Sequence, residues 1–342
     1  MSKYIQAPVS PFVISTEITI SEFLKGMAKT AFQGKNLGIA ADIWSEMLKE
    51  NTTILLGLAG AMVPAGMRKV IVYLIENRMI DCLVSTGANL FHDLHESLGN
   101  FHYQGTDQVN DIELWEEGID RIYDVFAKDS EFIKTDEFII NFLERLEQNR
   151  AYNTREYFFL LGKMLLEIYR EEGILTSAAK TNLPIYCPAI GDSSFGLALG
   201  TQQNVKKRGI LFDIIKDVVE INQIVTSRNV SGMIMVAGGT PKNFIQQAKL
   251  LNSILDKKLS TGYKYAIQIT TDSPHWGGLS GCTFEEGQSW GKINQQAEKV
   301  TVYCDATIAL PILVTAVAER NKDILKKRIK PTFILGEELK IL

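Results

Sequence analysis

The segment 283–293, with the sequence TFEEGQSWGKI, contains the side chains best suited to covalent chemistry. The spacing of Thr283 and Glu286 is that of a capping box, which predicts a helix that begins here and ends just before Lys292. Glu286 and Trp290 would share one face of that helix, where they could bind a cationic amine. A lysine amine in an apolar or cationic setting loses its proton more readily and becomes a nucleophile. The segment therefore indicates covalent catalysis by Lys292, with a solvated lysine at a helix end as the alternative.

A second group of reactive side chains lies in the sequence HDLHE, where His92 and His95 are three residues apart and His102 follows nearby. Two histidines on one helix face could bind a metal, but the H-E-x-x-H pattern is absent, and we predict no metal site. Because His92 lies one or two turns beyond a loop at Thr86, we interpret it as a group that moves protons or binds substrate. A structural or solvated histidine is the alternative.

Five loops that follow apolar segments combine small residues with hydroxyl or carboxylate side chains. Small residues let a cofactor approach the backbone, helix N-terminal amides suit phosphates, and carboxylates suit ribose hydroxyls. These loops predict a dinucleotide site spread over several strand ends, although ordinary turns use the same residues and the G-x-G-x-x-G fingerprint is absent. The loops are 85–89 (STGAN), 188–194 (PAIGDSS), 237–242 (AGGTPK), 270–272 (TTD) and 305–307 (DAT).

The elements that must position these loops follow from the hydrophobic pattern. Short apolar runs that do not alternate with polar residues are typical of strands covered on both faces. Helical patterns separate these runs, so we predict an α/β fold with a doubly wound, mostly parallel, Rossmann-like sheet and helical cover segments. The predicted strands are 53–58, 81–85, 183–187, 231–236, 265–270 and 300–304, and the predicted helices are 67–77, 90–98, 211–226, 241–255 and 308–320.

The whole chain, 1–342, is interpreted as a single domain, because neither a linker nor an internal repeat interrupts it. Residues 1–35 form an N-terminal extension. The charged segment 111–175 is expected to be a helical insertion or cover. The lysine-rich tail after about Asn321 is expected to be exposed at the surface.

Composition excludes several classes of protein. With 46% hydrophobic and 22% charged residues the chain is globular, and a net charge of −4 without a basic run disfavours nucleic acid as a partner. The most apolar stretch, 53–63, is too short to span a bilayer, and we expect a cytoplasmic enzyme without membrane contact. The cysteines form no C-x-x-C pair and are expected to be buried, reduced thiols; they are Cys82, Cys187, Cys282 and Cys304.

Taken together, these segments resemble the deoxyhypusine synthase family, and in particular its bacterial deoxyhypusine synthase-like branch, from about Asn36 to Pro311. The segment 289–293 (SWGKI) resembles the catalytic lysine motif of that family. It lies in family order between 269–271 (ITT) and 302–306 (VYCDA). Further matches are Cys187-Pro188-Ala189 with Asp192, and the loop that contains Gly238, Gly239 and Lys242.

The resemblance implies NAD as cofactor and a homotetramer with active sites between subunits. It implies that Lys292 carries an aminobutyl imine, and that Trp290 and Glu286 line a channel for a polyamine such as spermidine. Asn243 and Asp272 are further candidates for substrate binding. The positions that the resemblance assigns to the cofactor are Thr86, Gly87, Asp192, Gly238, Gly239, Thr271, Asp305 and Ala306.

The chain departs from the eukaryotic members of the family around the substrate. Leu197 and Leu279 stand where those enzymes carry carboxylates, Asn243 replaces a histidine, and His92 stands in place of a catalytic glutamate. A desolvated polyamine needs countercharge, so these departures favour a small or altered substrate, with Asp272 as one replacement charge. Further departures are Trp276 for an aspartate and Ala61 for a cofactor-side asparagine, and further replacement charges are Asp93 and Glu96.

The expected function is an NAD-dependent aminobutyl transferase. Hydride leaves the carbon beside a secondary amine of the polyamine, Lys292 attacks the resulting imine, and the aminobutyl group passes to an acceptor amine before hydride returns. His92 is the candidate for moving protons. A small acceptor such as putrescine, as in homospermidine synthase, is preferred, and a lysine of a translation factor is the alternative. An oxidoreductase with net NAD turnover and a non-catalytic NAD-binding protein stay open.

Overall fold

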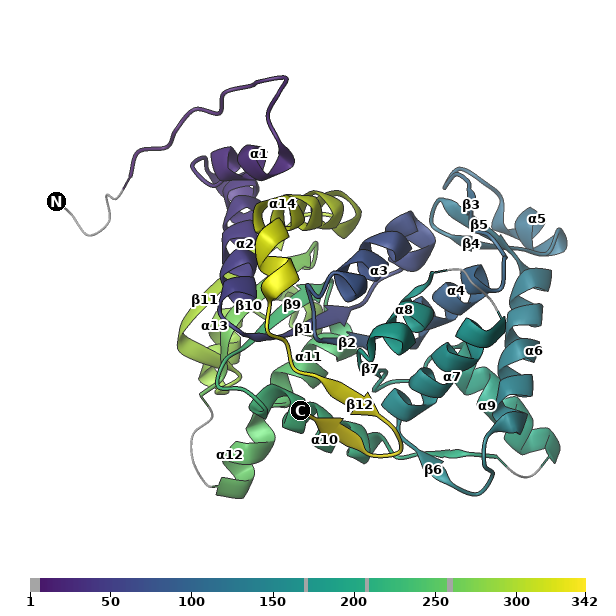
Figure 1. The fold of residues 1–342 in the computed structure, drawn as a ribbon. Helices are drawn as coiled ribbons and strands as arrows, with labels where there is room; N and C mark the ends of the chain where they lie inside the picture. Colours follow the sequence, from purple (N-terminus) through teal and green to yellow (C-terminus); the bar gives the residue numbers. More distant parts are fainter. Residues whose placement is uncertain (1–6, 169–171, 207–208, 257–260) are drawn as a thin grey trace.

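A six-stranded parallel sheet forms the centre of the computed structural model, which describes residues 7–168, 172–206, 209–256 and 261–342 (Figure 1). The strand order is β11-β10-β9-β1-β2-β7, and every neighbouring pair is parallel. Numbered along the chain, this is the 3-2-1-4-5-6 order of doubly wound dinucleotide-binding sheets, which confirms the predicted fold class. The strands are β1 (Thr53–Leu58), β2 (Cys82–Ser85), β7 (Ile185–Tyr186), β9 (Ser231–Val236), β10 (Tyr263–Thr270) and β11 (Ile293–Tyr303).

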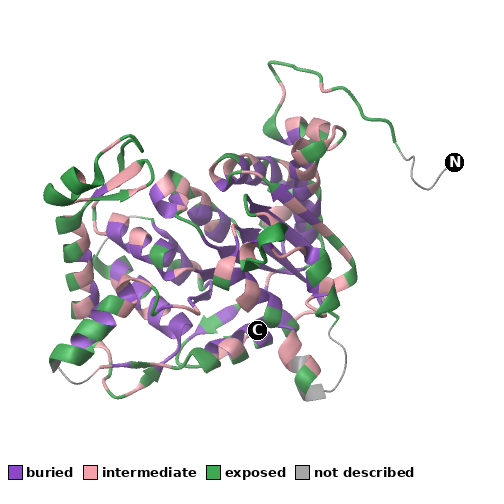
Figure 2. Ribbon diagram, turned by 180° about the vertical axis from the view of Figure 1, so that it is seen from behind, coloured by how far each residue is buried: buried purple, intermediate pink, exposed green. Residues whose placement is uncertain are grey.

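Helices cover both faces of this sheet, because successive side chains of a strand point to opposite faces. Ile54, Leu56 and Leu58 of β1 enter one hydrophobic core, whereas Leu55 enters the other. Figure 2 shows these buried residues concentrated in the strands and on the inner sides of the helices. The first core contains residues of α2 (Phe32–Lys49), α3 (Arg68–Glu76) and α14 (Ala306–Lys327), and the second contains residues of α10 (Ile214–Thr226) and α11 (Gly239–Gln247).

Local hydrogen bonds explain where predicted helices differ from observed ones. The helix expected over 211–226 begins at Ile214, because Asp213 caps it through Oδ1 to the backbone N–H of Lys216, at 2.9 Å. The helix expected over 241–255 is divided into α11 and α12 (Leu250–Asp256). At the break, the carbonyl oxygen of Ala248 accepts a 2.7 Å hydrogen bond from the Asn222 side chain.

The segment 111–175 is not purely helical, and that part of the prediction is wrong. Its sequence IDRIYDVFAK forms the hairpin of β4 (Ile119–Ile122) and β5 (Val125–Lys128). The surrounding charges obscure the alternation of apolar and polar residues that is typical of such strands. Together with β3 (Tyr103–Gln104) these strands form a separate antiparallel sheet. The remaining elements of the segment are α5 (Asp111–Glu116), α6 (Asp129–Arg145), β6 (Ala151–Tyr152), α7 (Thr154–Ile168) and the start of α8 (Ile174–Thr181).

The two ends of the chain pack differently from each other. Residues 7–19 form an extended segment before α1 (Ile20–Met27), which lies against α14 (Figure 1). Phe12 of this segment packs on Phe23 of α1 at a ring-centroid distance of 4.9 Å. As expected, most residues after Asn321 are exposed or half-buried. The segment is nevertheless ordered: helix α14 continues to Lys327, and Phe333 and Leu335 of β12 (Phe333–Leu335) are buried beside β13 (Leu339–Ile341).

Within the described residues, none of the helices is long and apolar enough to cross a membrane.

A buried ion pair attaches this C-terminal segment to the central sheet. Arg328 donates to Asp81 Oδ2 at 2.6 Å, and both side chains are fully buried. The same carboxylate accepts from the backbone N–H of Ile54 at 2.8 Å, and Arg328 also donates to the carbonyl oxygens of Arg78 and Thr52. The pair therefore joins the end of α14 to the starts of β1 and β2.

We expect Asp81→Asn to lower the free energy of unfolding by about 3–5 kcal/mol, because it leaves the Arg328 charge buried without a counterion. Urea denaturation monitored by circular dichroism would measure the change. The matched control is Asp323→Asn, which breaks an exposed pair with Lys326 and should cost less than about 0.5 kcal/mol. Equal effects of the two substitutions would contradict the structural role of the buried pair.

Candidate active site

All six strands are parallel, so the loops that follow them lie along one edge of the sheet. The strand order reverses between β1 and β9, and sheets of this kind bind ligands at that topological switch point. The two loops at the switch point contain unusual backbone conformations, with φ of +75° at Gly60 and +58° at Ala237. This edge is therefore the expected position of a nucleotide.

The N-terminus of α4 (Gly87–Ser97) lies at this edge and has no side-chain cap. Instead, Asn89 turns back, and its Nδ2 donates to the Gly60 carbonyl oxygen at 2.7 Å and to Thr86 Oγ1 at 3.0 Å. Its Oδ1 accepts from the Val63 backbone N–H at 3.1 Å, so the loops after β1 and β2 are held together. An uncapped helix start with free backbone amides suits a phosphate group.

Two predicted cofactor glycines are places where neighbouring loops approach too closely for a side chain. A Cβ atom on Gly87 would lie 2.3 Å from Ser193 Oγ, and one on Gly238 would lie 2.5 Å from Ser280 Cα. Gly239 has φ of +60° and donates its N–H to Ser280 Oγ at 2.9 Å. Loop packing accounts for these glycines, and their contact with a cofactor stays a prediction.

The other predicted cofactor positions lie in the loops after β7, β10 and β11. Asp305 caps α14, and its Oδ1 accepts from the N–H of Thr307 at 2.7 Å and from the hydroxyl of Thr307 at 2.6 Å. The side-chain and backbone hydrogen bonds of Thr307 lower the pKa of this carboxyl. Asp192 and Thr271 are exposed, whereas Ala306 is buried. The structure thus brings all eight predicted positions to one edge of the sheet.

Lys292 is fixed at the end of a short helix, α13 (Phe284–Ser289). Thr283 Oγ1 accepts from the N–H of Glu286 at 3.1 Å, which confirms the predicted helix start. At the other end Gly291 has φ of +70°, its N–H donates to Gln288, and the N–H of Lys292 donates to Gly287, both at 3.0 Å. These two hydrogen bonds form a Schellman motif, which fixes the backbone from which the lysine side chain extends.

The Lys292 amine has neutral and aromatic neighbours. Its Nζ donates to Asn243 Oδ1 on α11 at 2.9 Å, and lies 5.4 Å from the ring centroid of Trp290. Within the part of the chain that the structure describes, no carboxylate forms a salt bridge with it. Trp290 is 65% exposed, which leaves its ring available for a cationic ligand. The sequence predicted these residues individually, and the structure brings them together.

A second lysine, Lys242, lies beside this group and is fully buried. Its Nζ donates to Gln268 Oε1 at 2.9 Å and to the carbonyl oxygens of Ser280 at 3.2 Å and Cys282 at 2.5 Å. These bonds hold the 280–282 loop, which leads into α13, against β10. In the sequence Lys242 is only part of a loop that matches the family, and its burial cannot be predicted from a single polar residue.

The charges around Lys242 show which groups gather at this place. Burial lowers the pKa of Lys242 to about 8, with a further lowering from the charge of Lys292. Glu286 and Asp272 act in the opposite direction and raise it. Both carboxylates are exposed, so they remain available to a cationic substrate. The structure therefore places Glu286 and Asp272 in the electrostatic environment of the two lysines.

His92 lies in a different cluster, against Phe132 of α6 at a ring-centroid distance of 5.5 Å. Its Nδ1 is 2.9 Å from His102 Nε2, and His102 Nδ1 is 2.8 Å from Glu96 Oε1. Burial, followed by the charges of His102 and His95, lowers the pKa of His92 to about 3. The cluster is polar and half-buried within a largely aromatic setting.

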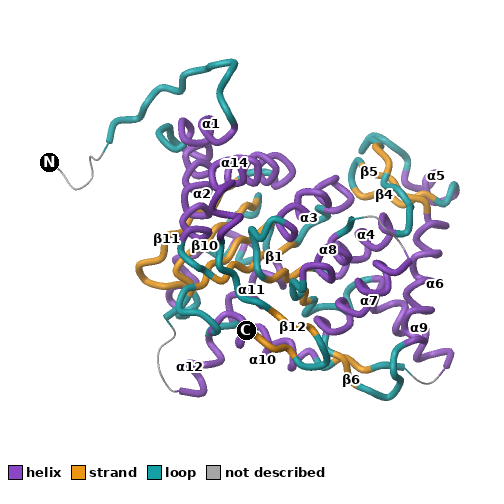
Figure 3. The backbone as a smooth tube through the Cα atoms, in the orientation of Figure 1, coloured by secondary structure: helices purple, strands orange, loops and turns teal. Residues whose placement is uncertain are grey.

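Within a single subunit, His92 and Lys292 lie far apart. His92 belongs to the helix after β2, whereas Lys292 immediately precedes β11, and β1, β9 and β10 lie between those strands. Four strand spacings of about 4.8 Å separate β2 from β11, or roughly 19 Å across the sheet. Figures 1 and 3 show α4 and β11 on opposite sides of the molecule.

The described residues contain no set of three or more His, Cys, Asp or Glu side chains arranged to hold a metal ion.

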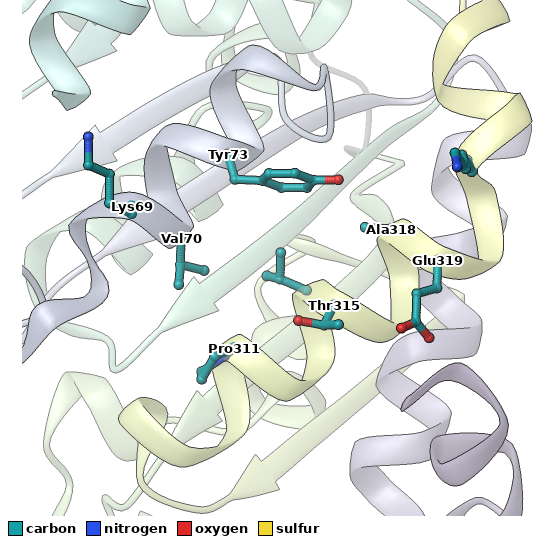
Figure 4. Close-up of a pocket in the computed structure, with 9 residues that line it drawn as sticks. Lys69, Val70, Tyr73, Pro311, Thr315, Ala318 and Glu319 are labelled. Carbon is teal, nitrogen blue, oxygen red and sulfur yellow. The ribbon is translucent and has the colours of Figure 1, made fainter. Parts of the chain in front are cut away.

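A groove of about 520 Å³ lies between α3 and α14 (Figure 4), and it contains none of the predicted site residues. Its lining includes Lys69, Val70, Tyr73, Pro311, Thr315 and Glu319.

Comparison with known proteins identifies the family of this chain. The model of the family described as deoxyhypusine synthase matches residues 22–317. The chain belongs to the deoxyhypusine synthase family. A Methanosarcina mazei protein named probable deoxyhypusine synthase 2 is 52% identical over 319 residues, which cover 92% of this chain and 90% of that protein. A deoxyhypusine synthase-like protein of Chlorobaculum parvum is 34% identical, with coverage of 91% and 89%.

A solved structure supports the fold assignment. The crystal structure of an Entamoeba histolytica protein assigned as a deoxyhypusine synthase superposes with a TM-score of 0.61. It is 19% identical and covers 88% of this chain and 93% of that chain, so it supports the fold alone. Family membership shows that the chain is a transferase, which contradicts the alternative of a non-catalytic NAD-binding protein.

The positions at which the resemblance implies departures from the eukaryotic members are mostly exposed. Leu197, Leu279 and Trp276 are 69%, 39% and 84% exposed.

The pKa of Lys242 gives a pH-dependent stability that can be measured. Its ordinary value of 10.5 falls to about 8 in the fold, so between these values the unfolded chain binds the proton more tightly. The free-energy cost of burying the charged Lys242 in the folded protein is complete below pH 8. This cost disappears as the pH rises to 10.5. The free energy of unfolding of the natural protein, relative to Lys242→Met, should therefore rise by on the order of 2 kcal/mol across this window.

Urea denaturation at several pH values would measure this difference. The control is Lys264→Met, because a hydrogen bond to Glu50 raises the pKa of Lys264 and its difference should not rise in the same window. A flat difference for Lys242 would show that its ammonium is fully compensated by its hydrogen bonds.

Proposed function

We propose that this protein transfers an aminobutyl group from a polyamine to the side-chain amine of a protein lysine, the activity indicated by the names of its relatives. The observation that carries the proposal is the Lys292 amine, hydrogen-bonded to the neutral Asn243 oxygen at 2.9 Å and lying over Trp290. The relatives' names favour a protein acceptor over the small-amine acceptor that the sequence alone favours.

NAD fits the residues at the carboxyl edge of the sheet. Thr86 and Gly87 would present the uncapped start of α4 to its phosphates, and Gly238 and Gly239 would leave the backbone accessible. The Asp305 carboxylate would suit a ribose hydroxyl, although it is also the cap of α14. When bound, NAD would supply an acceptor and later a donor of hydride, with no net redox change.

The residues around Lys292 have complementary functions in this proposal. The neutral amine of Lys292 attacks the imine carbon of the oxidised polyamine, and a diamine leaves. The Asn243 oxygen orients the amine through the 2.9 Å hydrogen bond. Glu286, Asp272 and the face of Trp290 hold the cationic amines of the substrate. Lys242 holds the loop before α13 and so positions the lysine.

We expect Lys292→Arg to abolish covalent capture of the aminobutyl group. The protein would be incubated with NAD and isotope-labelled spermidine, treated with borohydride, and analysed by intact mass and peptide mapping. The natural protein should gain one aminobutyl group on Lys292, because borohydride reduces the imine to a stable amine. Lys264→Arg, an exposed lysine paired with Glu50, should retain the adduct.

Addition of an acceptor in place of borohydride tests the second half of the reaction. The proposal expects label to move to a lysine of a translation factor with a basic loop. An adduct on Lys292→Arg, or full transfer activity in that variant, would eliminate the mechanism.

A small acceptor such as putrescine is the second candidate. The exposed Leu197 and Leu279 favour it, because the resemblance implies that they stand where the eukaryotic members have carboxylates that neutralise the polyamine. Transfer of label to putrescine but not to the protein acceptor would support this homospermidine synthase-like activity.

We also propose a homotetramer in which the active site forms between subunits. Support comes from the separation of His92 and Lys292 by three strands in one chain, since a proton-moving group must lie within reach of the reacting amine. A second subunit could place its His92 beside Lys292 of the first. Cytoplasmic location stays a prediction of the sequence.

Mixed oligomers test this arrangement. His92→Gln and Lys292→Arg should each be inactive alone, whereas co-expressed in equal amounts they should recover about a quarter of the natural activity, because some sites take both intact residues from different subunits. The transfer assay with purified mixed oligomers measures the recovery. Activity no higher than the sum of the two variants would place the complete site within one subunit.

A further inference from the structure

His92 is the first member of a continuous chain of hydrogen bonds. Its Nδ1 lies 2.9 Å from His102 Nε2, and His102 Nδ1 lies 2.8 Å from Glu96 Oε1. The His102 side chain is only 5% exposed, whereas that of Glu96 is 24% exposed. The resemblance implies no function for His102, and Glu96 is otherwise only a possible countercharge for the substrate.

The valence of the nitrogen and oxygen atoms restricts where protons can lie in this series of hydrogen bonds. An ionised Glu96 can only accept, so His102 Nδ1 must carry a proton. If His102 is neutral, its Nε2 is an acceptor, and the proton between the two rings must belong to His92 Nδ1. The remaining nitrogen of His92, Nε2, then has a free lone pair and is a base.

The outer nitrogen of His92 is not engaged. Among the described residues no hydrogen bond reaches Nε2 of His92 and the residue is half-buried, whereas Nε2 of His95 is buried without a hydrogen-bond partner. The other ring nitrogen of His95 is held by Thr135 at 3.2 Å. The two histidines of the same helix face are therefore different, and only His92 presents a base to a ligand.

We propose that His102 and Glu96 form a proton relay behind His92, which lets His92 act as the base of the transfer reaction. The inference rests on the proposed function, in which His92 moves the protons of the polyamine. His102 and Glu96 are positioning residues, because they act on the substrate only through His92.

The relay moves one proton and no electrons. An N–H bond of the substrate ammonium breaks and an N–H bond forms at His92 Nε2. The proton on His92 Nδ1 passes to His102 Nε2, so that His92 is again neutral and His102 becomes an imidazolium beside the Glu96 carboxylate. Return of the proton to the leaving diamine reverses both steps.

The surrounding charges explain why the relay is needed. Burial and the neighbouring histidines disfavour a charge on His92, so a proton that stayed there would be held weakly. On His102 the same charge forms an ion pair with Glu96. Arg68 lies 3.6 Å from Glu96 but is engaged by Asp93 at 2.7 Å, and Glu131 contributes negative charge near His95.

The first test observes the protons directly in the full-length oligomer. The chain has only four histidines, so ¹⁵N-histidine labelling and magic-angle-spinning NMR of sedimented protein can resolve them, with single substitutions for assignment. The relay requires His92 protonated at Nδ1 and His102 protonated at Nδ1 in the resting protein. A His92 protonated at Nε2, or a His102 that carries both protons from about pH 6 to 9, would overturn it.

The second test uses kinetics. His102→Gln and Glu96→Gln should each lower kcat about 100-fold and move the acid limb of the kcat–pH profile, with KM for spermidine unchanged, because general-base efficiency is lost while binding is kept. His275→Gln, at the exposed histidine outside this cluster, should keep both the rate and the profile. A fall in stability without a change in the pH profile would show that His102 is merely structural.

The adduct experiment and the NMR experiment together distinguish failure of the relay from failure of the proposed function. If the natural protein forms no adduct on Lys292 with any polyamine, the proposed function fails, while the NMR result still decides whether the relay exists. If the adduct forms and His92 has the wrong tautomer, the relay alone is overturned.

Discussion

The structure depends on one constraint, the burial of a fully parallel sheet on both faces. Parallel strands need a crossover between each pair, and here the crossovers supply the helices that cover the two cores. The constraint also decides where polar chemistry can occur. Both faces of the sheet are occupied by apolar side chains, so polar loops meet only at the strand ends. The strand order reverses between β1 and β9, and the loops that follow these two strands are therefore the expected position of a nucleotide.

Lys292 is positioned by a separate device, since it precedes its strand instead of following it. The Schellman motif at Gly291 fixes the backbone, and buried Lys242 holds the loop that leads into the helix. A buried ammonium is costly unless all its protons are used, and its three acceptors use them. The catalytic candidate is thus supported by rigid backbone geometry instead of by a salt bridge.

The sequence predicted the fold well because a doubly wound sheet is specified by local patterns. β1 and β9 were predicted to the residue, since each is a short apolar run between turn signals. The hairpin at 119–128 is not predicted, because its alternation is weak and its residues are charged. The buried anchor of the otherwise mostly exposed tail is not predicted either, because Arg328 has the composition of a surface residue. A buried charge is revealed only by its partner, here Asp81, which lies far away in the sequence.

The candidate site was predictable as residues but not as an arrangement. Lys292, Trp290, Glu286 and Asn243 converge in the structure, yet His92 lies beyond three strands from them. The resemblance implies that His92 stands where the eukaryotic members have a glutamate, and the surroundings of His92 give this difference a physical meaning. Burial raises the pKa of a carboxylate and makes it a stronger base, but it lowers the pKa of a histidine and makes it a weaker one. A histidine in this setting therefore needs another group to receive the proton, and His102 with Glu96 supplies it at 2.9 and 2.8 Å.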